Sequence, residues 1–184
     1  MKIESLANAV ETNIMRVFRK FKEKPAVFLS KSDVTCYMYY LLVTDPFLGF
    51  SPTILNLAPA ISKSKTFIVH AGLEISIEGE SKQVALSIGE SSKETNLSSW
   101  DFPIGIEIEH NLESSPEAQA ILSEDIEKIA KFKRGYLLCL NWDNPVSDDN
   151  VMKVKKLIAE HENVQFFYID LCTNPGKTNV RRIT

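Results

Sequence analysis

The sequence predicts a mixed α/β (α+β) fold in which helices flank a central mixed sheet. Residues 1–45 show helical hydrophobic spacing, residues 66–110 show three runs of alternating apolar and polar side chains, and the rest alternates helix with strand. Spacing of three and four is typical of helices, and spacing of two is typical of strands. We therefore predict an antiparallel three-stranded meander continued by a parallel strand–helix–strand unit.

Length and composition predict a single domain, residues 1–184, with an ordinary hydrophobic core. The net charge of −3 excludes general electrostatic attraction to nucleic acid and leaves only a local basic patch. The three cysteines, Cys36, Cys139 and Cys172, are scattered in apolar runs, which predicts buried free thiols in a reducing compartment. No apolar run reaches about 18 residues, so we expect a cytoplasmic protein with no membrane partner.

Two helices are predicted at the start of the chain. The first covers roughly residues 4–23, and the second begins at the Ser32–Asp33 cap and ends before Pro46. The end of the first helix is basic, with Arg16, Arg19, Lys20 and Lys22 close together. These cations suit a solvated helix C-terminus, or they form a nucleic-acid-binding patch that faces phosphates.

The predicted sheet core covers residues 66–172. Its meander consists of residues 66–77, a turn at 78–81, residues 83–88, a flexible loop at 89–99, and a third strand that ends near residue 110. Residues 112–122 are expected to be a loop or short helical turn, followed by a helix from Ser123 to Arg134. Two strands follow, 136–142 and 164–172, with a helix at 147–162 between them. Residues 173–184 are predicted to be a frayed polar tail.

The third strand carries the most distinctive pattern. Ile104, Ile106 and Ile108 share one face, and the other face carries Glu107 and Glu109. Two carboxylates on one strand face repel each other unless cations or water compensate them. This strand face is therefore predicted either to face solvent or to hold a positive group.

This strand, with the helix and strand that follow it, resembles the PD-(D/E)XK nuclease superfamily, which has the restriction-endonuclease-like fold. In that family the strand carries Glu, any residue, then Lys, and an Asp lies on the preceding strand. The resemblance implies phosphodiester hydrolysis of DNA assisted by Mg²⁺ or Mn²⁺, in which carboxylate oxygens hold the metal and the Lys assists the attacking water.

The resemblance makes Glu107 a metal ligand and places Glu109 where Lys is usual, as a candidate base for the water. Antiparallel pairing through a hairpin centred near residue 96 places Ala85 opposite Glu107, at the position of the family's Asp. Asp101 or Glu90 could supply the third metal-binding carboxylate if the strands splay.

Other charged residues are candidates for such a site, but each is better explained by a structural role. Lys128, Lys131 and Lys133 do not replace the missing lysine: helical-wheel positions turn the first two away from the core, and the third lies at the far end. Glu124 and Asp125 are better explained as acids at a helix N-terminus. His110 points away from both glutamates, because side chains alternate along a strand.

Three hypotheses follow. The chain is a metal-dependent nuclease of this superfamily, or a catalytically inactive member that binds nucleic acid or a protein, or an unrelated α/β protein whose glutamates face water. The superfamily resemblance also implies that the protein could be a homodimer. The first two hypotheses are favoured, because placing Glu107 and Glu109 side by side costs repulsion that a purely structural strand does not need.

Overall fold

A computed structural model describes most of the chain. It covers residues 3–45, 48, 67–90, 101–113, 115–141, 147–170 and 179–183. Cys172 and the connections at 49–66 and 91–100 lie outside the described residues.

The described residues form a six-stranded mixed sheet whose spatial order follows the sequence. The strands are β1 (Phe67–Ile77), β2 (Glu80–Glu90), β3 (Asp101–His110), β4 (Arg134–Asn141), β5 (Val164–Asp170) and β6 (Asn179–Ile183). β1, β2 and β3 are an antiparallel meander, β3, β4 and β5 are parallel, and β6 returns antiparallel to β5. The predicted fold class is confirmed.

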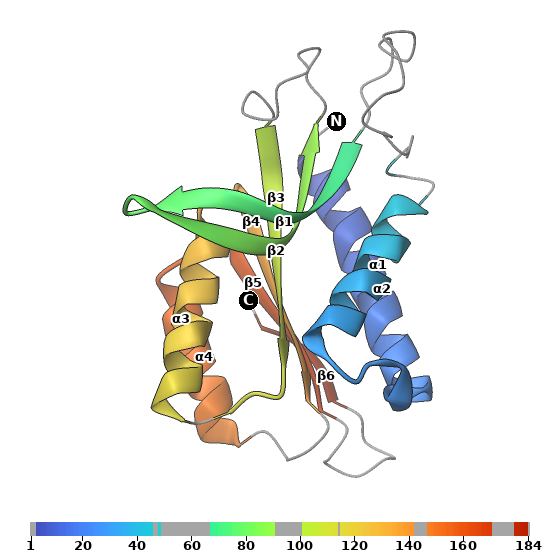
Figure 1. The fold of residues 1–184 in the computed structure, drawn as a ribbon. Helices are drawn as coiled ribbons and strands as arrows, with labels where there is room; N and C mark the ends of the chain where they lie inside the picture. Colours follow the sequence, from blue (N-terminus) through green and yellow to red (C-terminus); the bar gives the residue numbers. More distant parts are fainter. Residues whose placement is uncertain are drawn as a thin grey trace, which may run out of the picture.

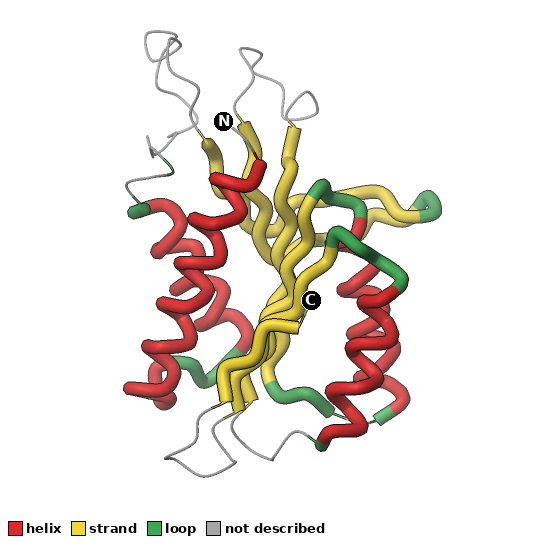
Figure 2. Tube along the Cα trace, turned by 180° about the vertical axis from the view of Figure 1, so that it is seen from behind, coloured by secondary structure: helices red, strands yellow, loops and turns green. Residues whose placement is uncertain are grey.

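Helices cover both faces of the sheet and make a three-layer molecule (Figure 1). They are α1 (Ile3–Glu23), a short 3₁₀ turn (Pro25–Val27), α2 (Lys31–Val43), α3 (Pro116–Ala130) and α4 (Asp148–Ala159). Figure 2 shows α1 and α2 on one side of the strands and α3 and α4 on the other. In the described residues no helix has the length and apolar composition needed to cross a bilayer.

The alternation along β3 decides which layer each side chain meets. Ile104, Ile106 and Ile108 are fully buried in the apolar cluster that also contains the core residues of α1 and α2. Glu107 and Glu109 therefore face the α3 layer. Strands β4 and β5 are buried on both faces, as expected for parallel strands between two helical layers.

The meander has the predicted turn and the predicted register. Glu78 and Gly79 both have positive φ, the backbone geometry of a two-residue hairpin. Leu86 lies opposite Ile106 on β3, the register that places Ala85 near Glu107. The described pairing of β2 with β3 ends there, and the β1–β2 hairpin continues across α3 (Figure 1).

Several predicted boundaries are wrong. Helix α3 begins at Pro116 with Ser115 as its N-cap, so most of the predicted loop at 112–122 is helical. Helix α2 begins at Lys31, capped by Ser30, one residue before the predicted start. Residues 179–183 form the edge strand β6, not a frayed tail, although two arginines occupy it. Charged residues are common on edge strands because they discourage pairing with other chains.

The prediction for the cysteines is half right. Cys139 and Cys36 are both free thiols, and Cys139 is fully buried in β4. Cys36 is exposed, because its position on α2 lies outside the stripe that faces the sheet.

Candidate functional site: a buried cluster of carboxylates and lysines

The candidate site lies on β3 where its described pairing with β2 has ended. Glu107 is only 2% exposed, which is rare for a carboxylate and requires charged or hydrogen-bonding partners. The backbone N–H of Ala85 donates to its Oε1 at 3.1 Å, so the carboxylate caps β2 where that strand leaves β3. Glu107 thus occupies the position that the sequence predicts, opposite Ala85.

Helix α3 supplies two further charged groups to Glu107. The ammonium of Lys128 lies 3.1 Å from Glu107 Oε1 and 2.5 Å from Asp125 Oδ1. It also donates to the carbonyl of Gln83 on β2, at 3.2 Å. Lys128 and Asp125 are both buried, so the prediction that neither belongs to the site is wrong. For Asp125 the cause is the misplaced helix start, since this residue lies in mid-helix and not in the first turn. Lys128 is excluded by its position on the helical wheel, yet its ammonium reaches Glu107.

Helix α2 supplies the central cation. Nζ of Lys31 lies 2.6 Å from Glu109 Oε1, 3.8 Å from Glu107 Oε2 and 3.6 Å from Asp125 Oδ2. Lys31 is the first residue of α2, whose apolar side chains pack on the opposite face of the sheet. Its side chain reaches the α3 layer beside the edge of β3 from which β2 has departed. One ammonium therefore contacts all three carboxylates.

The cluster holds three carboxylates and two ammonium groups, so it is not fully compensated when every group is charged. Burial, together with repulsion from Asp125, raises the pKa of Glu107 above its ordinary value. Burial and a hydrogen bond with Asp125 raise the pKa of Glu109 to about 7, against the opposing effect of Lys31.

The remaining members of the cluster favour their charged forms. Burial acts to raise the pKa of Asp125, but hydrogen bonds with Glu109 and Lys128 outweigh it and lower that pKa. Burial acts to lower the pKa of Lys31 and Lys128, but the carboxylates around them raise both. The two lysines are therefore stabilised in their protonated, charged form, and the two glutamates are stabilised in their protonated, neutral form.

The expectation that Asp101 or Glu90 joins Glu107 is wrong. These two residues lie opposite each other in the β2–β3 ladder, at the start of β3. Glu107 lies six residues further along, about 20 Å at the usual rise per strand residue. The strands do separate, but at the other end of the ladder, so the third carboxylate comes from α3.

The basic residues of α1 lie on the opposite side of the sheet from this cluster (Figure 1). Arg16, Arg19 and Lys22 are exposed and Lys20 is half-exposed. Arg16 already has partners within the chain, because its guanidinium donates to Asn13 and lies 3.6 Å from the carboxylate of Asp45. Their role in binding nucleic acid stays a prediction.

The cluster does not fit a divalent metal ion. Every one of its carboxylates already contacts Lys31, and two also contact Lys128. Within the described parts of the chain, no group of three histidine, cysteine, aspartate or glutamate side chains is arranged to hold a metal ion. The cations of this site belong to the chain itself.

Comparisons with known proteins add no relative. No family model matches the chain, and neither the curated proteins nor the solved structures contain a match. The fold and the site define a mixed α/β sheet protein with a cluster of three carboxylates and two lysines between its third strand and α3.

Proposed function

We propose that this chain is a PD-(D/E)XK-like protein that binds a partner and does not hydrolyse phosphodiesters. The observation that carries the proposal is the position of Lys31, whose ammonium lies within 4 Å of Glu107, Glu109 and Asp125. An ammonium surrounded by three carboxylates supplies the positive charge that the superfamily obtains from Mg²⁺. The resemblance in element order and in Glu107 supports the superfamily assignment.

Physical chemistry disfavours replacement of Lys31 by a divalent ion. A metal would have to displace the ammonium of Lys31 from at least two of its three carboxylates. It would also lack the water-activating lysine on β3, because Glu109 occupies that position. Ala85, where the superfamily carries its Asp, removes a further oxygen ligand.

A protein is the favoured partner. The molecule has a net charge of −3, and the cluster on β3 is acidic overall, so this side of the sheet repels phosphates. DNA is the second candidate ligand, which the exposed cations Arg16, Arg19 and Lys22 on α1 favour. A second copy of the chain is a further candidate partner under the superfamily resemblance.

A second candidate function is a Mg²⁺- or Mn²⁺-dependent nuclease. The convergence of three carboxylates with two lysines favours it, because the same residue types serve phosphodiester hydrolysis in the superfamily. In that function Lys31 would have to leave the cluster before a metal could enter.

A cleavage assay separates the two functions. Supercoiled plasmid and single-stranded RNA are incubated with the protein in Mg²⁺ and in Mn²⁺, in parallel with Glu107→Gln. This variant keeps the shape of the side chain and an acceptor for the Ala85 N–H. We expect both proteins to leave the substrates intact. Nicking or cleavage by the wild type that disappears in Glu107→Gln would establish the nuclease instead.

A further inference from the structure

A small pocket opens beside the cluster at the carboxyl end of β3. Its volume is about 200 Å³, and it is lined by Glu109, His110, Asn111, Leu112, Glu113, Ala118, Ile121 and Leu122. This volume is below the range of about 300–1,000 Å³ that is usual for small-molecule sites. Ligands of open α/β sheets commonly bind outside the carboxyl ends of the parallel strands, which is where this pocket lies. The size suits one side chain of a partner.

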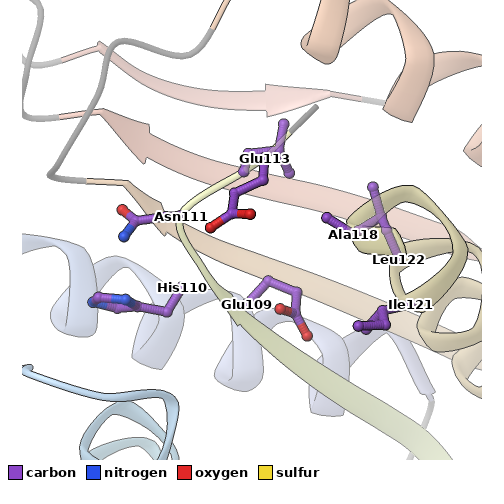
Figure 3. Close-up of a pocket in the computed structure, with 8 residues that line it drawn as sticks. Glu109, His110, Asn111, Glu113, Ala118, Ile121 and Leu122 are labelled. Carbon is purple, nitrogen blue, oxygen red and sulfur yellow. The ribbon is translucent and has the colours of Figure 1, made fainter. Parts of the chain in front are cut away.

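The pocket has one acidic wall and one apolar wall. Glu109 and Glu113 both line the pocket; Figure 3 shows the carboxyl group of Glu109 turned toward Ile121 on α3 and that of Glu113 turned toward the side of Asn111. The facing wall comes from α3 and includes Ile121, whose side chain is 55% exposed. An exposed isoleucine next to two carboxylates suits a ligand that is apolar along its length and positive at its end.

The charge balance at the pocket also favours a cation. Glu113 is exposed, and among the described residues no cation forms an ion pair with it. Glu109 belongs to the cluster of three carboxylates and two ammonium groups, which carries one net negative charge when every group is charged. The pocket thus lies in a negative region where a positive group from a partner is attracted.

We propose that this pocket binds an arginine side chain of a protein partner. The methylene stem lies against Ala118, Ile121 and Leu122, and the guanidinium lies between the carboxylates of Glu109 and Glu113. Its planar fork of donors suits carboxylates from two different segments, and buried arginines are frequent anchors of protein interfaces. The inference rests on the proposed binding function and names the chemistry of the partner.

Methyl-labelled NMR tests the pocket with two probes of similar shape. N-acetyl-arginine amide carries the guanidinium, and N-acetyl-citrulline amide replaces it with an uncharged urea group. We expect the arginine probe to shift the methyl signals of Ala118, Ile121 and Leu122, and the citrulline probe to bind roughly tenfold more weakly, as the loss of one charge-assisted hydrogen bond implies.

Two glutamate variants, one at a residue that lines the pocket and one on α3, provide the comparison. Glu113→Gln is expected to weaken the arginine probe by a similar factor, whereas Glu117→Gln, an exposed glutamate that does not line the pocket, keeps wild-type binding. Equal binding of both probes, no shifts with either probe, or wild-type binding by Glu113→Gln would overturn the proposal. So would a short DNA duplex that shifts the Met15 methyl on α1 while the arginine probe shifts nothing. None of these results depends on cleavage or metal binding. A negative result would therefore overturn the arginine pocket without overturning the proposed function.

Discussion

Replacing Lys128 by methionine is expected to lower the free energy of unfolding by about 3–5 kcal/mol, the range seen when one partner of a buried ion pair is removed. The variant leaves Glu107 and Asp125 buried and close to each other, with Lys31 more than 3.5 Å from either. For a chain of this length the loss corresponds to a fall in Tm of roughly 6–20 °C. Urea denaturation and thermal unfolding measure both quantities.

Lys131 on the same helix provides the matched control. It is exposed, and Lys131→Met is expected to change stability by no more than about 0.5 kcal/mol. The double variant Lys128→Met with Glu107→Gln removes one of the uncompensated charges, so it should be more stable than Lys128→Met alone. If Lys128→Met unfolds at the same urea concentration as Lys131→Met, the buried cluster does not exist in solution as described.

The second large effect concerns pH. The pKa of folded Glu109 is raised to about 7, whereas an unfolded glutamate titrates near 4.3. The folded state therefore holds more protons between these two values, and its stability should fall as pH rises through that window, by about 4 kcal/mol in total. Glu109→Gln cannot ionise, so we expect it to remove this decline and to be more stable than the wild type at pH 8.

The titratable groups around Glu109 also contribute to the pH dependence of stability. They are Lys31 of α2, Asp125 of α3, Glu107 on β3 and the neutral, fully buried thiol of Cys139 on β4. Glu107 also has a raised pKa, so its ionisation likewise lowers the stability of the folded state as pH rises. The lowered pKa of Asp125 acts in the opposite direction, because stability from Asp125 is lost only as pH falls below about 4.

Stability curves of wild type, Glu109→Gln and the exposed control Glu117→Gln between pH 4 and pH 9 test the assignment. The control should follow the wild type. Two results would show that the pKa of Glu109 is not raised in the folded state. One is a wild-type stability that rises steadily from pH 5 to pH 8, and the other is a Glu109→Gln variant with the same decline as the wild type.

The architecture of the sheet was predictable from local patterns. Alternation along residues 104–109 assigned the isoleucines and glutamates to opposite faces of β3, and the hairpin rule gave the register that places Ala85 beside Glu107. Both features depend on the period of a strand and on chain connectivity, which the sequence contains directly.

The contributions of α3 were missed because its start was placed at Ser123. Ser115 followed by Pro116 is a helix-start signal, since proline is favoured in the first turn after a serine cap. A helix that begins there includes both Leu122 and Asp125. Because these residues are three apart in the helix, they share the stripe that faces the sheet. The same signal identifies Asp125 as a candidate for the site.

Lys31 had no comparable signal. It precedes Glu109 by 78 residues, and the helix that carries it packs on the other face of the sheet. Its contact with Glu109 depends on the place where β2 leaves β3, which is a property of the assembled sheet. A single sequence does not encode such a juxtaposition in any local pattern.

The central claim is that Lys31 takes the position of a catalytic metal. Calorimetric titration of Mn²⁺ into the wild type, with Glu107→Gln as the control, tests it most directly at neutral pH and moderate salt. We predict no saturable heat from either protein. A stoichiometric binding isotherm from the wild type that is lost in Glu107→Gln would contradict the account and would place a metal ion, not a lysine, at the centre of the carboxylate cluster.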